Sequence, residues 1–67
     1  MDESYLLSRI TISPDGKPWL EEPKIWVSVI HTLLAVGWSN DEILSAYAGL
    51  EEEDIQACII YGAQHPA

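Results

Sequence analysis

Two short corners of nearly the same pattern constrain this chain more than any other feature. Each begins with a glycine (Gly37, Gly49), continues through an apolar residue and a polar run, and reaches an isoleucine five places after the apolar residue. Glycine adopts the left-handed backbone conformation that closes a helix at little cost. The apolar residue and the isoleucine have the spacing of a hydrophobic staple. The pattern therefore predicts helices that end and restart at both corners. The two staple pairs are Trp38 with Ile43 and Leu50 with Ile55.

The two corners differ in how the next helix is capped. Ser39 and Glu42 have the S-x-x-E spacing of a capping box, in which the two side chains accept hydrogen bonds from each other's backbone N–H groups. In the second corner, Glu51 stands where Ser, Thr, Asp or Asn is preferred. We therefore expect a poorer cap on the third helix.

Apolar residues at helical spacing predict three short amphipathic helices, at Val27–Val36, Asn40–Ala48 and Glu52–Ala63. Together they form a three-helix unit over residues 27–64. Short links between such helices are typical of a helix-turn-helix module. The predicted fold is mainly α, with the helical unit preceded by a short β arm.

The β arm covers residues 1–25. Ile10–Ile12 is a β-prone run, and Pro14–Lys17 contains the proline and Asp-Gly signals of a tight turn. Pro18–Leu20 can extend again, which predicts a strand or hairpin. We expect Met1–Ser4 to be a frayed acidic start and Glu21–Pro23 to interrupt the pattern.

The length of 67 residues predicts a single domain, spanning residues 1–67, with a small core. Cys58 is the only cysteine, so no disulfide framework exists, and no Cys and His cluster offers a structural metal. Small domains without such staples often gain stability by oligomerising, and a homodimer is our expectation. The sequence lacks the pattern of a signal peptide or a membrane span. We expect a cytoplasmic protein with no membrane partner.

Charge is distributed very unevenly along the chain. Eleven acidic residues against three basic ones give a net charge of −8, and no lysine or arginine occurs after Lys24. Nucleic-acid affinity rests largely on phosphate neutralisation by Lys and Arg, so the helical half is poorly equipped for it. A basic protein partner fits better, because opposite fields speed encounter.

The acidic run at the third helix has two interpretations. Its residues lie in the first helical turn, where the helix dipole stabilises negative charge, and this alone can explain them. Alternatively, they form a binding surface for a basic partner. The run consists of Glu51, Glu52, Glu53 and Asp54.

Few residues in the chain could support catalysis. His31 is expected to flank a packed helix face, and His65 lies in a tail before Pro66. Cys58 lies on the apolar side of its helix, where cysteine usually behaves as a small buried hydrophobe. No phosphate-binding loop, nucleophile elbow or spaced set of metal ligands is present. We expect no enzyme activity, no cofactor, no metal and no small-molecule substrate.

Two further sets of residues are candidates for binding. Trp19 and Trp26 flank the Glu21–Pro23 break; they either pack against the helices or form an aromatic contact surface, since tryptophan is enriched at interface hot spots. For DNA, the third helix would be the recognition helix. The candidates for DNA contact are Arg9, Lys17, Lys24 and Gln56.

In its order of motifs the chain resembles a small prokaryotic family, domain-of-unknown-function family 433, which is sometimes described as antitoxin-like with a homeodomain-like fold. The resemblance covers Arg9 to Ala63 and rests on the combined order and spacing of many weak elements. These elements are Arg9-Ile10-Thr11, Gly16-Lys17-Pro18, Ile25 with Val27, Leu33-Leu34-Ala35 with Gly37 and Ser39, Glu42-Ile43-Leu44 with Tyr47, Leu50 with Glu53-Asp54-Ile55, and Tyr61.

The resemblance implies a hairpin-like arm, a three-helix homeodomain-like domain and a dimer. It also implies similarity to VapB-type antitoxins, which neutralise a PIN-like ribonuclease toxin and can repress their own operon. This chain departs from the family pattern at three places. An Arg-Gly-Thr-Arg-like segment is replaced by Glu21–Lys24, Trp26 stands at the first helix cap, and Glu51 stands at the third.

Three functional hypotheses follow. The first is a non-enzymatic antitoxin-like protein that binds and neutralises a basic, PIN-like ribonuclease toxin, using the acidic run, Trp19 and Trp26. The second is a helix-turn-helix DNA-binding regulator that represses its own promoter. The third is a structural dimer with no ligand.

Overall fold

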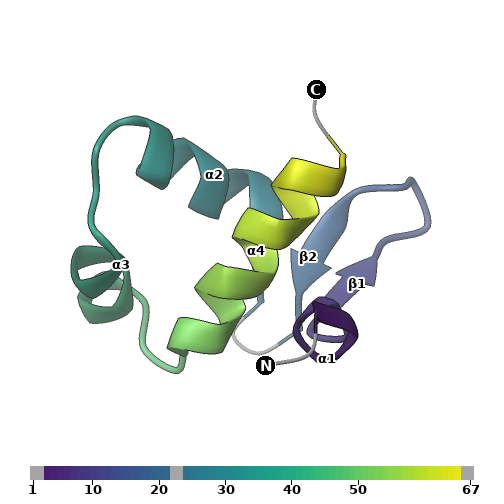
Figure 1. The fold of residues 1–67 in the computed structure, drawn as a ribbon, viewed down its shortest axis with the longest axis horizontal. Coiled ribbons are helices and arrows are strands. Elements are labelled where there is room, and N and C mark those ends of the chain that lie inside the picture. Colours follow the sequence, from purple (N-terminus) through teal and green to yellow (C-terminus); the bar gives the residue numbers. More distant parts are fainter. Residues whose placement is uncertain (1–2, 22–23, 66–67) are drawn as a thin grey trace.

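The computed structural model describes residues 3–21 and 24–65. Within these ranges helix α4 runs through the middle of the molecule, with α3 at one end and the β1–β2 hairpin at the other (Figure 1). Helix α4 contacts α1, α2 and α3. The elements are α1 (Glu3–Leu7), β1 (Ile10–Ile12), β2 (Pro18–Leu20), β3 (Ile25–Trp26), α2 (Val27–Ala35), α3 (Asn40–Ala46) and α4 (Glu52–Gln64).

The three predicted helices are present, and each begins at the predicted residue. Their ends differ from the prediction by one or two residues, which is the usual uncertainty of helix termini. The corner glycines have positive φ angles, 100° at Gly37 and 88° at Gly49, as the left-handed helix end requires. The first capping box is formed: the Glu42 N–H donates to Ser39 Oγ at 3.2 Å, and the Ser39 N–H donates to Glu42 Oε1 at 2.9 Å.

The N-terminal third differs from the prediction. Glu3 and Ser4, expected to be frayed, belong to α1, and a third strand, β3, leads directly into α2. Five residues are too few for a stable isolated helix; α1 persists because Leu6 is buried and the helix packs on α4. Met1, Asp2, Glu22 and Pro23 lie outside the described residues. The fold is therefore mixed, with helices packed around a small antiparallel sheet.

The sheet has the strand order β1-β2-β3, and both pairs are antiparallel. The Ser13 N–H donates to the Lys17 carbonyl at 2.9 Å beside the tight turn. Hydrogen-bonded and non-bonded pairs alternate along an antiparallel ladder, so the next pair, Ile12 opposite Pro18, is a non-bonded one. Proline lacks a backbone N–H, and this register explains why the strand tolerates Pro18.

The core lies between the sheet and the helices. Opposite residues of paired strands share a face, and Leu20, with its neighbours Ile10 and Ile25, faces the core. The second staple residue, Leu50, is buried, whereas Trp38 of the first corner remains 38% exposed. The main buried cluster consists of Leu20, Val27, Ile30, Ile43, Leu50, Ile55 and Cys58.

Candidate functional site

The start of α4 is the most polar part of the structure. Glu51 occupies the N-cap in an extended conformation, and its backbone N–H donates to Asp54 Oδ2 at 2.9 Å. Asp54 thereby supplies the returning side chain of a capping box. Although Glu51 is a poor cap by type, this N-terminus is held by the aspartate three residues later.

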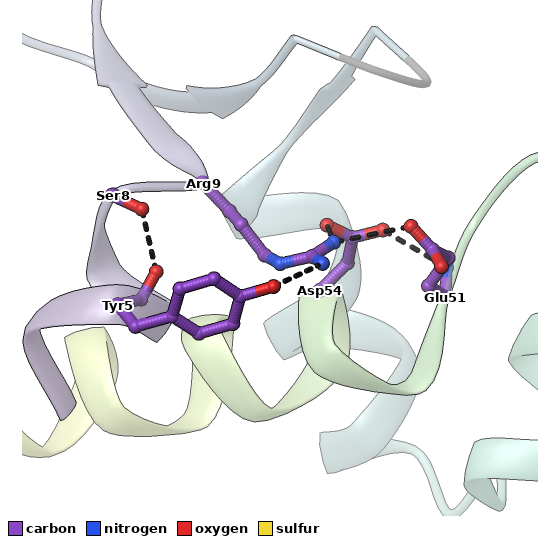
Figure 2. Close-up of polar contacts among 5 residues, drawn as sticks. All are labelled: Tyr5, Ser8, Arg9, Glu51 and Asp54. Carbon is purple, nitrogen blue, oxygen red and sulfur yellow. Dashed lines mark hydrogen bonds and ion pairs between the residues drawn. The ribbon is translucent and has the colours of Figure 1, made fainter. Parts of the chain in front are cut away.

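Asp54 is buried and paired with a residue far away in the chain. Its side chain is only 3% exposed, and its Oδ1 accepts a hydrogen bond from Arg9 Nη1 at 3.0 Å. The same guanidinium nitrogen lies 3.3 Å from Glu51 Oε1 (Figure 2). Arg9 follows α1, so this ion pair joins the N-terminal arm to α4.

Tyr5 completes the environment of Arg9. The Arg9 Nη2 group donates to the Tyr5 hydroxyl at 3.3 Å, and the guanidinium carbon lies 5.7 Å from the centre of the tyrosine ring. The hydrogen bond to Tyr5, followed by that to Asp54, raises the pKa of Arg9 above its usual value. The arginine side chain is 23% exposed, and its charge is compensated inside the protein.

Apart from the buried Asp54, the carboxylates at this end of the molecule lie at the surface. Asn40 Nδ2 donates to Glu52 Oε1 at 2.8 Å, which brings the N-termini of α3 and α4 side by side. Five carboxylates therefore gather where two helices begin, and four of them are exposed, while Glu53 is half-buried. We call this surface the acidic corner; it consists of Asp41, Glu42, Glu51, Glu52 and Glu53.

A hollow of about 400 Å³ lies beside the acidic corner, between α1 and α4. Leu6 contributes an apolar wall, and Glu52, Glu53 and Gln56 contribute polar ones. An apolar wall beside carboxylates suits the aliphatic stem and the cationic head of a lysine or arginine. The sequence alone gave no indication that Leu6 belongs to this surface, because α1 was not predicted.

The structure brings Trp19 and Trp26 together. They lie opposite each other on β2 and β3, with ring centres 6.2 Å apart and an interplanar angle of 44°. Trp26 is 45% exposed and Trp19 is half-buried. Trp26 also borders a second hollow, of about 390 Å³, with Lys17, Pro18 and Ser28. This second hollow shares no lining residue with the hollow beside the acidic corner.

The four DNA-contact candidates do not form a basic surface in the part of the chain that the structure describes. Arg9 is held by Asp54, and Lys17 lies 4.0 Å from Asp15 in the hairpin turn. Lys24 is exposed just before β3. The Gln56 amide donates to Glu52 at 3.3 Å. No hydrogen bond or ion pair joins the two lysines to Gln56.

The histidines and the cysteine have structural surroundings. His31 Nε2 lies 2.6 Å from the carbonyl oxygen of Cys58; because a carbonyl only accepts, this nitrogen carries the proton. Cys58 is fully buried, and burial together with the charge of Asp54 raises its pKa to about 12. Such a thiol is a poor nucleophile. Within residues 3–21 and 24–65, no group of three or more His, Cys, Asp or Glu could hold a metal ion.

None of the helices in the described ranges is long and apolar enough to cross a membrane. No curated protein and no solved structure matches the chain. A family model does match it, under the description "Protein of unknown function (DUF433)", over residues 10–62. This stretch includes the hairpin, both glycine corners and most of α4. The chain therefore belongs to the DUF433 family, as its sequence motifs indicated.

Proposed function

We propose that the chain is a non-enzymatic, antitoxin-like protein of the cytoplasm that binds and neutralises a basic protein through its acidic corner. The observation that carries the proposal is the meeting of the α3 and α4 N-termini, which places five carboxylates on one surface. Arg9 pairs with Glu51 at 3.3 Å, and residues 25–67 contain no lysine or arginine that could neutralise the other four. A field of this sign favours encounter with a positively charged partner.

The expected partner is a PIN-like ribonuclease toxin, by resemblance to VapB-type antitoxins. RNA-cleaving proteins need cationic surfaces to hold phosphate, so an acidic surface can cover such a groove. The hollow beside Leu6 gives one lysine or arginine of the partner a place to insert. Trp26, with the half-buried Trp19 beside it, offers a second contact area, since tryptophan is enriched among the residues that dominate binding energy.

The burial of Asp54 changes which residues test this proposal. Reversing its charge would place a cation against Arg9 inside the protein and would unfold the arm. The informative variant is Glu52→Lys/Glu53→Lys, whose side chains lie at the hollow. Its control is Glu3→Lys/Glu21→Lys, which changes the net charge equally while leaving the acidic corner intact. Circular dichroism verifies that both variants fold.

The experiment is affinity capture of the tagged chain from its native cells, followed by mass spectrometry and a ribonuclease inhibition assay. We expect a stoichiometric basic nuclease-like protein, inhibited by the chain and by the control variant. The acidic-corner variant should associate more slowly and with a flatter salt dependence. Recovery of the chain alone, or inhibition that survives the reversal unchanged, would refute the proposal.

A second candidate function is a homeodomain-like DNA-binding regulator, favoured by the consecutive short helices α3 and α4. Its recognition helix would be α4, read through Gln56, with Lys17 and Lys24 on phosphate. The acidic corner opposes this function, because α4 presents Glu52 and Glu53 beside Gln56. The test is a mobility-shift assay on the chain's own promoter at low salt. A specific shift abolished by Gln56→Ala would support it, and no shift by folded protein would exclude it.

A further inference from the structure

The outer edge of strand β1 is open in the described structure. In the part of the chain that the structure describes, β1 pairs only with β2, and β2 lies between β1 and β3. Because Ile12 and Pro18 form a non-bonded pair, Thr11 directs its backbone groups toward β2, and the next residue in each direction directs its own outward. The N–H and C=O groups of Ile10 and Ile12 therefore face the edge.

This edge is also apolar and nearly uncharged. Ile12 is 51% exposed, and a groove of about 440 Å³ runs beside it, lined by Leu7, Ile10, Ile12 and Tyr61 among others. No aspartate or glutamate occurs from Tyr5 to Pro14, and the one cation of that segment, Arg9, is paired with Asp54. In a molecule of net charge −8, a second copy therefore meets little like-charge repulsion along this edge.

The sequence of β1 is complementary to itself. In an antiparallel pairing centred on Thr11, Ile10 lies opposite Ile12 of the second copy and Thr11 lies opposite Thr11 of the second copy. The two isoleucine pairs are then hydrogen-bonded pairs that use the outward groups. Pairs of β-branched residues and Thr–Thr pairs stabilise adjacent strands. No like charges oppose each other in this register.

We propose that two copies of this chain join through their β1 strands into a continuous six-stranded antiparallel sheet. The twofold axis passes between the two Thr11 residues, so the interface is isologous and closed. Growth into a fibre is disfavoured because the other sheet edge, β3, has only two residues and continues directly into α2. A chain of this size without disulfides gains stability from such pairing. The proposal is independent of the acidic corner and of its partner.

The first test measures mass in solution by sedimentation equilibrium for the wild type, Ile12→Pro and Ile12→Val. The wild type should have twice the chain mass of 7.5 kDa. Proline removes the outward N–H and leaves the β1–β2 hydrogen bonds in place. Two hydrogen bonds are lost per dimer, so we expect Ile12→Pro to raise the dissociation constant about 10- to 100-fold. Ile12→Val keeps the backbone N–H and should change the dissociation constant only slightly.

A crosslinking test holds even if Ile12→Pro does not fold. Facing residues of a non-bonded antiparallel pair have Cα atoms about 4.5 Å apart, within disulfide range. Thr11→Cys should therefore form a covalent dimer in a glutathione buffer at least about tenfold faster than the exposed control Ser8→Cys, which has no symmetric partner in this register. The buried Cys58 does not interfere.

The outcomes separate cleanly. A dimer weakened by Ile12→Pro and captured by Thr11→Cys supports the proposal. A wild-type chain that stays monomeric overturns it, including the case where the strand of another protein occupies this edge. A dimer indifferent to Ile12→Pro, or equal crosslinking of Thr11→Cys and Ser8→Cys, also overturns it.

Discussion

At the scale of single residues, the ion pair between Arg9 and Asp54 gives both residues a structural role that differs from the binding role considered from the sequence. The sequence places Asp54 in an acidic run and Arg9 among possible phosphate contacts. In the structure each neutralises the other, at 3.0 Å and with the carboxylate buried. Removing one member of a buried pair leaves an uncompensated charge, which costs more than the pair itself contributes.

Replacing Arg9 should therefore be costly. We expect Arg9→Met to lower the free energy of unfolding by about 2–4 kcal/mol, somewhat below the cost for a fully buried pair because Arg9 keeps some solvent contact. Urea unfolding followed by circular dichroism measures this. Arg9→Met/Asp54→Asn should recover part of the loss. A loss below about 0.5 kcal/mol would mean that the pair behaves as an ordinary surface ion pair.

The raised pKa of Cys58 predicts that the stability of the protein depends on pH. Its pKa is raised in the fold from 9.0 to about 12, so the unfolded thiol ionises first. The stability that this group contributes is complete below about pH 9 and is lost as pH rises toward 12. A thiol reagent should react slowly with the native protein and quickly in urea. Rapid modification of the native protein at pH 8 would contradict the burial of Cys58.

At the scale of elements, local sequence signals predicted the helices well and the arm less well. The starts at Asn40 and Glu52 were predictable because glycine corners and caps act within one helical turn. The start at Val27 was predictable from the helical spacing of its apolar residues. Helix α1 was missed because five residues are too few for a helical pattern to be recognised, and the helix depends on Leu6 packing against α4. The contact between Trp19 and Trp26 was not predicted either. It depends on the pairing of β2 with β3, and β3 was not among the predicted strands.

The contact between α2 and α4 gives an element-scale prediction. A Cβ atom added to Gly62 would lie 2.9 Å from His31 Nε2, which displaces His31 from the Cys58 carbonyl. In a His31→Ala background, Gly62→Ala should stabilise the protein by about 1 kcal/mol through helix propensity. With His31 present, the lost hydrogen bond should cancel that gain.

A double-mutant cycle from urea unfolding isolates this coupling. We expect an interaction energy of about 1 kcal/mol between the two positions. Ala63→Gly, on an exposed position of the same helix, provides a control for propensity alone. If the effects of Gly62→Ala and His31→Ala on the free energy of unfolding are additive, the close approach of His31 does not require a glycine at position 62.

At the scale of the whole molecule, the net charge of −8 on a small chain repels itself. The sequence could reveal this total, but not that Arg9 is paired with Asp54 and that five carboxylates gather at one end. Those facts depend on which distant segments meet. The sequence therefore predicts that the chain is acidic, whereas the position and shape of the acidic corner depend on the fold.

Salt should stabilise this protein. Screening weakens repulsion among exposed charges, so the melting temperature should rise by at least about 4 °C between low salt and 0.5 M sodium chloride, equivalent to about 1 kcal/mol. Protein concentration must be held constant, since association also stabilises. Asp41→Asn/Glu53→Gln should show a smaller rise. A melting temperature that falls with salt would mean that ion pairs outweigh repulsion.

The ion pair between Arg9 and Asp54 has one more consequence, for how the protein opens. It joins residues 45 positions apart, at the start of the hairpin and in the first turn of α4. The arm cannot detach without exposing a charge that the helix needs neutralised, and α4 cannot fray from its beginning without releasing the arm. The slowest-exchanging amide hydrogens of β1 and α4 should therefore exchange in the same event, because the two segments behave as one cooperative unit.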